Sequence, residues 1–199
     1  MARKNVKELL IRTAIDLFFQ RGYEETSIRD IGKKAKVNTS LFYYYFRDKE
    51  EILYTIIERS TRDLINALKE IQSTEADPLE CLRKMITRHI VFSRENRKMT
   101  KIVTIETDQL GGQRKNHCYH LQRELYDIYK RQLQYLHRIH LLKDINLTVL
   151  NFVIFGMINW FYRWYKDGKP LSEEDVADQM IKIILVGILK AQNNYEETQ

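Results

Sequence analysis

Apolar and polar positions follow the period of an amphipathic helix along the first part of the chain. From Val6 to Phe18 the apolar residues recur in steps of three and four, which is the spacing of one helical face that packs on a core. Gly22 follows, and glycine readily adopts the left-handed conformation that ends many helices. The pattern therefore predicts a first helix that ends close to Gly22.

Two short helices are predicted after Gly22. Thr26 offers an N-cap for the first of them, which closes at Ala35. Asn38 or Thr39 can cap the next, through "SLFYYYF". Three helices in roughly fifty residues, with about four residues between the second and third, form the helix-turn-helix arrangement, whose second member normally enters the major groove of DNA.

A long fourth helix is predicted to link this motif to the rest of the chain. It begins at Asp48, with Glu51 in a box-like position three residues later, and covers 48–71. We expect a DNA-binding domain over 1–50 and a helical ligand-binding and dimerisation domain over 51–199. Further helices are predicted over 78–94, 97–108, 113–141, 146–166 and 172–193, and the tail "NNYEETQ" is expected to fray. The chain is thus predicted to be all-α.

Composition and charge agree with a helical protein that meets an anionic partner. Two prolines and seven glycines in 199 residues are too few for the turns of many short strands. The net charge is +6. Residues 1–50 contain eleven Lys or Arg and seven Asp or Glu, a net charge of 11 − 7 = +4. Most of the positive charge of the chain therefore lies in the helix-turn-helix region.

Cysteine usage and hydropathy indicate a cytoplasmic protein without a membrane partner. Cys81 and Cys118 match no metal or redox spacing, so two free thiols in a reducing compartment are the simplest interpretation. The N-terminus lacks the apolar segment of a secretory signal. The longest apolar stretch, 147–162, is interrupted by Asn151 and Asn159 and is shorter than the ~18 residues of a membrane span.

The stretch "TSLFYYYF" places three consecutive tyrosines on the expected recognition helix. Phe42, Tyr45 and Phe46 lie near one helical face and can pack beneath the motif. Tyr43 and Tyr44 then point away from that face. A phenol hydroxyl can donate to a phosphate oxygen, so the outward tyrosines are candidate clamps on the DNA backbone, whereas Tyr45 is equally well explained as a core residue.

The segment "TSIRDIGKKAKVNTSLFYYYFRDKEEIL", residues 26–53, resembles the DNA-binding motif of TetR-type transcriptional regulators. The matching positions are Thr26, Ile31, Ala35, Val37, Tyr43, Tyr45, Phe46, Lys49, Glu50 and Leu53. Two positions depart from the family pattern, because Gly32 stands where alanine is usual and Lys36 replaces the turn glycine. A left-handed backbone at Lys36 would cost roughly 1 kcal/mol, offset if its ammonium reaches a phosphate.

The resemblance implies a homodimeric, ligand-responsive DNA-binding regulator, most often a repressor, that binds a palindromic operator. Thr39, Ser40 and Leu41 would approach base edges and thymine methyl groups from the N-terminal end of the recognition helix. The other expected DNA contacts, mainly to phosphates, are Thr26, Lys36, Tyr43, Tyr44 and Lys49.

The last two long helices form the dimer interface in TetR-type proteins, and small residues there permit close approach. A homodimer is therefore expected. The interface residues expected on this basis are Gly156, Ala177, Met180, Ile184, Gly187 and Ile188.

The block "NWFYRWYKDGKPLSEEDVADQ" resembles a TetR branch that responds to acyl-CoA thioesters in fatty-acid, sterol and aromatic-acid catabolism. Such a ligand requires an apolar tunnel and cations for its phosphates. The expected wall is Phe92, Ile102, Ile105, Tyr126, Phe152, Phe155 and Trp160, with Arg163, Arg114 or Arg123 as the cation. Each of these aromatic residues is also compatible with an ordinary core, and each arginine with a solvated surface.

Three other functions stay open at this point. The helical pocket could belong to an enzyme acting on an apolar substrate, the motif to an architectural DNA-binding protein, and the regulator to a sensor of apolar drugs. The chain contains no GxGxxG, GxxxxGK or HExxH motif. In "NHCYH", His117 and His120 share a helical face but Cys118 diverges, so neither a zinc site nor a cofactor is predicted.

Overall fold

The structure of the chain, a computed structural model, describes residues 3–165 and 171–190 and is helical throughout that part. The elements are α1 (Arg3–Arg21), α2 (Ile28–Ala35), α3 (Thr39–Tyr45), α4 (Lys49–Thr74), α5 (Pro78–Glu95), α6 (Arg97–Glu106), the 3-10 turn η1 (Thr107–Gln109), α7 (Gly112–Arg138), α8 (Leu147–Asn159), α9 (Phe161–Trp164) and α10 (Glu173–Ile188). The all-α prediction is confirmed. The predicted tail and the far end of the last predicted helix, 191–193, lie outside the described residues.

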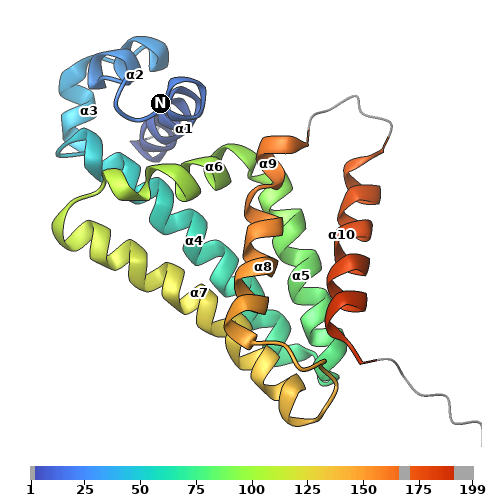
Figure 1. The fold of residues 1–199 in the computed structure, drawn as a ribbon. Helices are drawn as coiled ribbons and strands as arrows, with labels where there is room; N and C mark the ends of the chain where they lie inside the picture. Colours follow the sequence, from blue (N-terminus) through green and yellow to red (C-terminus); the bar gives the residue numbers. More distant parts are fainter. Residues whose placement is uncertain (1–2, 166–170, 191–199) are drawn as a thin grey trace, which may run out of the picture.

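The helices form a small N-terminal unit and a larger body, joined by α4 (Figure 1). Helices α1 to α3 cluster at one end of the molecule, and α4 runs from that cluster into the body, where it packs on α5 and α7. Helix α6 lies across the junction and contacts both α1 and α4. Helix α10 packs on α5 at the opposite side of the body.

Two apolar cores correspond to these two parts, and α4 contributes to both. Its first turns bury Ile52 and Ile56 in the N-terminal core, while Leu64 and Leu68 lie in the core of the body. The N-terminal core also includes Ile102 of α6, together with Leu110 and Cys118 from the start of the following segment. The N-terminal unit therefore buries residues well beyond position 50, although the division at that position stays a prediction.

The helix ends of the N-terminal unit explain why it folds locally. Gly22 ends α1 with a φ of 89°, in the left-handed region that glycine adopts readily. The prediction of Thr26 as the next N-cap is wrong: Ser27 is the cap and forms a capping box with Asp30. The Thr26 hydroxyl instead donates to the Gly22 carbonyl at 2.8 Å, which fixes the α1–α2 corner.

The caps of α3 and α4 agree with the sequence patterns. Asn38, one of two candidate caps, accepts the Leu41 amide with its side chain. At α4, Asp48 accepts the Glu51 amide at 2.6 Å, as expected for an N-cap. The Glu51 side chain accepts the Arg47 amide rather than the Asp48 amide, so the box is only half formed.

The turn between α2 and α3 explains both departures from the family pattern. Lys36 has a φ of 56°, so the left-handed position is occupied by a residue with a side chain. Gly32 lies so close to the turn that an added Cβ would stand 3.0 Å from the Val37 carbonyl oxygen. The Val37 amide closes the turn by donating to the Gly32 carbonyl at 2.9 Å. Glycine at position 32 thus allows a tight turn around Lys36.

The body differs from the predicted helices at its C-terminal side. The helix expected over 146–166 stops at Asn159 and restarts as the short α9, and its last residue lies outside the described part. Helix α10 ends at Ile188, earlier than expected. There the Lys143 amide donates to the Ile188 carbonyl and the Lys190 amide to the Leu141 carbonyl, which draws the backbone into an extended bridge.

Candidate DNA-binding surface and ligand pocket

The tyrosines of α3 divide as the helical period predicts. Tyr43 and Tyr44 are 53% and 62% exposed, whereas Phe42 and Phe46 are buried in the N-terminal core. Tyr45 is half-buried against that core. Two phenol hydroxyls therefore stand on the outer side of the helix-turn-helix, and their contact with phosphates stays a prediction.

The N-terminal end of α3 presents short polar side chains to solvent. Thr39 and Ser40 are exposed and Leu41 is half-buried, so the first turn can approach base edges. Lys36, Arg29 and Lys33 are also exposed. Arg29 and Lys33 were not singled out from the sequence, because their side relative to the recognition helix depends on how α2 packs. The exposed polar and cationic side chains of α2, the turn and α3 are of the kind that contact DNA.

Thr26 is buried and Lys49 is half-buried, and both bind the backbone of the α1–α2 corner. The Lys49 ammonium donates to the carbonyls of Tyr23 and Glu24 at 2.8 and 3.3 Å and lies 4.0 Å from the centre of the Tyr23 ring. Burial lowers the pKa of Lys49. Thr26 is fully buried, and its amide donates to the Tyr23 carbonyl. In the free protein both side chains hold the α1–α2 corner, and the phosphate contacts expected of Lys49 and of the Thr26 backbone stay a prediction.

Helix α6 holds α1 from the side of the body. The Glu106 carboxylate accepts the Tyr23 amide at 3.3 Å, and the Lys101 ammonium donates to the Phe19 carbonyl at 2.6 Å. Lys98, also on α6, pairs with Asp16 of α1. Burial, reinforced by nearby carboxylates, raises the pKa of Tyr23 to about 12, so its phenol stays neutral.

Arg114 provides a second link between the body and the N-terminal unit. Its guanidinium lies 2.8 Å from the Asp48 carboxylate and 3.6 Å from that of Glu50, at the start of α4. One of the three cations considered for the ligand is therefore committed to the junction between the two parts.

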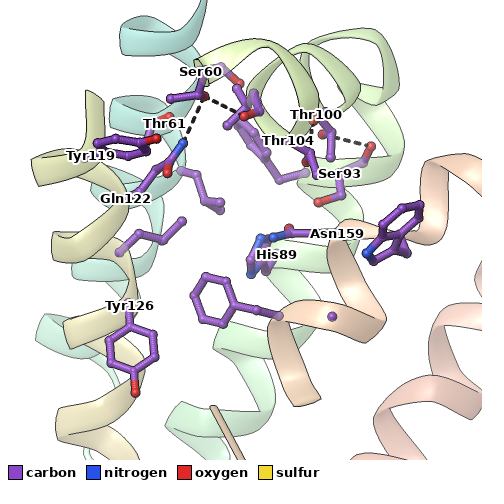
Figure 2. Close-up of a pocket in the computed structure, with 18 of the residues that line it drawn as sticks. Ser60, Thr61, His89, Ser93, Thr100, Thr104, Tyr119, Gln122, Tyr126 and Asn159 are labelled. Carbon is purple, nitrogen blue, oxygen red and sulfur yellow. Dashed lines mark hydrogen bonds between the residues drawn. The ribbon is translucent and has the colours of Figure 1, made fainter. Parts of the chain in front are cut away.

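A cavity of about 460 Å³ opens in the body between α4, α5, α6, α7 and α8. Five of the predicted wall residues line it, namely Phe92, Tyr126, Phe152, Phe155 and Trp160. Figure 2 shows labelled polar side chains entering the same space from several helices. The structure therefore brings together an apolar wall and a set of polar groups in one pocket.

Three predicted ligand residues do not line this pocket. Ile102 is fully buried in the N-terminal core, because it faces α1 rather than the cavity. Ile105 is 43% exposed at the surface. Arg163 is exposed, and its guanidinium lies 5.2 Å from the centre of the Trp160 ring. The prediction was wrong for Ile102 and Ile105, and Arg163 stands beside the pocket rather than in it.

The polar lining of the pocket was missed by sequence reasoning. These residues are single positions on different helices, so they leave no local pattern in the sequence. They are Ser60 and Thr61 of α4, His89 and Ser93 of α5, Thr100 and Thr104 of α6, Thr107 and Asp108 of η1, Tyr119 and Gln122 of α7, and Asn159 of α8.

His89 is a neutral, fixed hydrogen-bonding group in the pocket. The Tyr129 hydroxyl donates its proton to the Met85 carbonyl at 3.0 Å, and its oxygen lies 3.3 Å from Nδ1 of His89. Nδ1 of His89 is therefore the donor of that bond, and Nε2 is left as an acceptor. Burial lowers the pKa of His89 from 6.5 to about 3, despite an opposing contact with Asn159.

A cationic groove adjoins the pocket. It shares Tyr119, Gln122, Tyr126 and Phe152 with the pocket and adds Arg123, Lys130 and Thr148. The Arg123 guanidinium lies over the Tyr126 ring and 3.3 Å from the Asp127 carboxylate. Of the three candidate cations, Arg123 is thus the one that lies on a hollow continuous with the pocket.

The expected dimer residues fall on two different sides of the last helices. Met180, Ile184 and Ile188 are buried in the core of the same chain, where α10 packs on α5, so they were wrongly assigned to an interface. Ala177 is half-buried against the same core. Gly156 and Gly187 face open space, since an added Cβ would meet no atom within 4 Å among the described residues.

A different apolar stripe is open on these helices. On α8 it comprises Val149, Phe152 and Val153, which are all more than half exposed and recur at helical spacing. On α10, Ile183 and Val186 are 62% and 65% exposed. An apolar surface of this kind on two helices is typical of an interaction site.

The fold and the site define a helix-turn-helix DNA-binding protein with an attached ligand pocket. Residues 10–55 match the profile described as "Bacterial regulatory proteins, tetR family", and residues 75–188 match "Tetracyclin repressor-like, C-terminal domain". The chain belongs to the TetR family of transcriptional regulators and is not an enzyme. Regulators of this family bind operator DNA and small-molecule effectors and act as dimers.

Curated relatives align with almost the whole chain. The HTH-type transcriptional repressor KstR2 of Mycolicibacterium smegmatis is 24% identical, over 94% of this chain and 93% of the relative. The fatty acid metabolism regulator protein of Bacillus subtilis is 20% identical, over 94% of this chain and 98% of the relative. Both relatives are thus similar to this chain across both of its parts.

Solved structures show the same fold. AibR, in complex with isovaleryl coenzyme A and operator DNA, superposes with a TM-score of 0.82 and 25% identity, over 89% of this chain and 97% of that one. KstR2 of Mycobacterium tuberculosis gives a TM-score of 0.85 at 23% identity, over 92% of this chain and 95% of that one, which is evidence for the fold alone.

Each helix in the described part of the chain is too short or too polar to cross a membrane. Over the same residues, no group of three or more His, Cys, Asp or Glu is placed to hold a metal ion. Cys118 is buried in the N-terminal core, and the His117 ring lies 5.9 Å from that of Tyr54, centre to centre.

The buried neutral His89 predicts a loss of stability in mild acid. The unfolded chain binds a proton at this residue near pH 6.5, but the folded chain does so only near pH 3. Between these values the unfolded state holds the extra proton, so lowering the pH from 6.5 to 5 should cost about 2 kcal/mol of unfolding free energy. Urea unfolding at pH 7 and pH 5 should show this loss in the wild type, and a smaller one in His89→Gln.

The exposed His120 supplies the control for this measurement. His120→Gln should retain the acid sensitivity of the wild type. Equal pH dependence in the wild type and the His89→Gln variant would show that His89 is not held neutral by burial.

Proposed function

We propose that this protein is a homodimeric repressor that binds a palindromic operator and leaves it when an acyl-CoA thioester enters the pocket. The thioester's acyl part would lie against the aromatic wall, and its phosphates would lie outside, along the groove of Arg123 and Lys130. The recognition helix α3 would enter the major groove, with Thr39 and Ser40 at base edges and Tyr43 and Tyr44 at phosphates.

The observation that carries the proposal is that one helix serves both the pocket and the N-terminal unit. Thr100 and Thr104 of α6 line the cavity. On the same helix, Lys101 and Glu106 bind the backbone of α1 and of the α1–α2 corner. A ligand that displaces α6 therefore acts directly on the position of the helix-turn-helix, and a tenfold change in operator affinity requires only about 1.4 kcal/mol.

Two observations favour an acyl-CoA over other effectors. AibR, a structural relative at 25% identity, was solved with isovaleryl coenzyme A and operator DNA. The groove next to the pocket offers two cations beside Tyr126, which suits a ligand with an apolar group and phosphates at opposite ends. The rival proposal is a sensor of apolar drugs, for which the aromatic wall alone would be sufficient.

The dimer would form through the open stripe of α8 and α10. A second copy of the chain fits this surface because dimers are general in the family, and because the stripe combines apolar side chains with Gly156 and Gly187, which allow close approach. Phe152 lies both on the stripe and at the pocket. The ligand and the partner subunit would therefore meet at adjacent surfaces.

The first prediction of this function concerns the phosphate clamp. Tyr43→Phe removes a hydroxyl while keeping the ring, so it should weaken binding to every duplex by roughly 1 kcal/mol per half-site. Ser40→Ala should instead change which sequence is preferred. Fluorescence anisotropy with duplexes selected from a random pool would measure both effects, and log affinity should fall steeply with log salt, since roughly 6 to 10 phosphates are neutralised per dimer.

Tyr135→Phe is the matched control, because Tyr135 is an exposed tyrosine on α7, far along the chain from α3. It should leave DNA binding unchanged. If Tyr43→Phe behaves like this control at all salt concentrations, the Tyr43 hydroxyl makes no phosphate contact.

The second prediction concerns assembly. Val186→Arg and Gly187→Arg each place a charge on the apolar flank of α10, where burial against a partner would leave it without compensation. Both variants should sediment as monomers at micromolar concentration and lose operator binding together. Asp178→Arg, on the polar flank of the same helix, should stay dimeric. Dimeric Val186→Arg protein would place the interface elsewhere.

The third prediction concerns the effector. Octanoyl-CoA and cyclohexanecarbonyl-CoA should release the operator at micromolar concentration, whereas the free acids should act poorly, because they lack the phosphates. Arg123→Gln and Lys130→Gln should each raise the required thioester concentration about tenfold, on the order of 1.4 kcal/mol. Anisotropy titrations of the preformed operator complex would measure these concentrations.

Two comparisons decide where the phosphates bind. Arg131→Gln, on the same helix but outside the groove, should respond as the wild type does. If Arg163→Ala blunts the response and Arg123→Gln does not, the phosphates lie beside Trp160 instead. If free acids or unrelated apolar drugs release the operator equally well, the drug-sensor proposal replaces the thioester proposal.

A further inference from the structure

Thr61 carries a buried hydroxyl that the protein itself does not satisfy. This residue of α4 lines the pocket and is only 4% exposed. Its Oγ1 atom is buried and has no hydrogen-bond partner in the part of the chain that the structure describes. A buried polar atom without a partner is rare in folded proteins, and a binding role is one of the explanations for it.

Other threonines in this protein satisfy their hydroxyl within their own helix, whereas Thr61 does not. The hydroxyls of Thr55, Thr104 and Thr107 each donate to the carbonyl one turn earlier, at 2.7, 2.8 and 2.7 Å. This bond to the preceding turn satisfies a threonine inside a helix without any outside partner. The Thr61 hydroxyl makes no such bond, so its proton is left without an acceptor among the described residues.

The neighbouring polar groups limit what that molecule can be. Thr107 is saturated, because its hydroxyl donates to the Val103 carbonyl and accepts from the Gln122 amide at 3.1 Å. The proton of Thr104 is also committed. Figure 2 shows Thr61, Tyr119 and Gln122 at the same end of the pocket. Among the described residues of this end, Thr61 has a buried hydroxyl whose proton finds no acceptor, and a ligand oxygen would supply one.

We propose that Thr61 forms a subsite for a carbonyl oxygen of the effector, so that the natural ligand is an oxygen-bearing molecule rather than a plain hydrocarbon chain. The inference rests on the proposed function for the identity of the ligand as an acyl thioester. Two oxygens would satisfy the same chemistry: the thioester carbonyl itself, or a keto group carried further along the acyl part. In either case the ligand restores the missing hydrogen bond of a buried hydroxyl.

The subsite is tested with a pair of small probes of nearly equal shape, cyclooctanone and methylenecyclooctane, which differ in a carbonyl oxygen against a CH₂ group. Their affinities for the wild type and for Thr61→Val are measured by NMR titration without DNA. The preference for the ketone should fall about tenfold in Thr61→Val, and Thr61→Ser, which keeps the hydroxyl, should restore it. The two probes differ in hydration, but this difference is the same for every variant. It therefore cancels when the ketone-to-alkene affinity ratio of one variant is divided by that of another.

Thr107→Val is the matched control, because it removes a hydroxyl that is already satisfied. It should lower the free energy of unfolding, whereas Thr61→Val should leave that quantity unchanged or raise it. The proposal is overturned if the ketone preference is the same in the wild type and Thr61→Val, or if Thr61→Val destabilises the protein as much as Thr107→Val does.

The two possible oxygens are separated with coenzyme A derivatives. Octanoyl-CoA, 7-oxooctanoyl-CoA and S-octyl-CoA, a thioether that lacks the carbonyl, are compared for binding to the wild type and Thr61→Val. If Thr61→Val loses affinity for octanoyl-CoA and 7-oxooctanoyl-CoA but not for S-octyl-CoA, the bound oxygen is that of the thioester. If it loses affinity for 7-oxooctanoyl-CoA alone, the bound oxygen is that of the keto group. Equal losses for all three compounds contradict the subsite.

These readouts also separate the inference from the proposed function. If the ketone preference depends on Thr61 but no coenzyme A derivative releases the operator, the subsite stands and the thioester effector fails. If thioesters release the operator and the Thr61→Val variant responds normally to each of them, the proposed function stands and the subsite fails.

Discussion

The arrangement of the whole molecule depends on how Tyr23 is held at the α1–α2 corner. Its amide donates to Glu106 at the end of α6, and its carbonyl accepts from Lys49 at the start of α4. The Lys49 ammonium also lies over the Tyr23 ring. Gly22 turns the chain just before this point, with a φ of 89°. Two helices of the body thus set the orientation of the helix-turn-helix.

Helix α6 is the proposed route of the ligand signal because its two faces belong to different parts of the protein. Ile102 is buried in the N-terminal core, while Thr100 and Thr104 line the pocket. A packed core does not deform continuously, so a shift of α6 must be taken up by α1 or by α4. Both recognition helices of a dimer must fit half-sites one DNA turn apart, ~34 Å, and a small rotation of each would disturb the fit.

Several features that depend on local spacing were predicted from the sequence, although the N-cap of α2 was placed at Thr26 instead of Ser27. The cap at Asn38 and the outward direction of Tyr43 and Tyr44 follow from positions within one or two helical turns, and the structure agrees with them. Features that depend on packing between helices were not predictable in this way. Lys49 matched a DNA-contacting position, yet its ammonium binds a corner that lies 26 residues away in the chain.

The same limit explains the errors in the body. Helix α10 has apolar residues on two flanks, and only its packing on α5 decides that Met180 and Ile184 face inward while Val186 faces outward. The polar pocket residues come from different helices, so Thr61 and His89 had no pattern to reveal them. The five aromatic residues that line the pocket could be proposed from the sequence, because aromatic side chains are few and each one can be weighed as a wall residue.

Transmission through α6 is tested by amide hydrogen exchange at Tyr23, measured with and without saturating octanoyl-CoA. The amide should be protected in the free protein and in the operator complex, because Glu106 accepts its hydrogen bond. The thioester should release this protection together with the operator, while amides in the middle of α1 stay protected. Release of the operator with unchanged protection at Tyr23 would contradict transmission through α6.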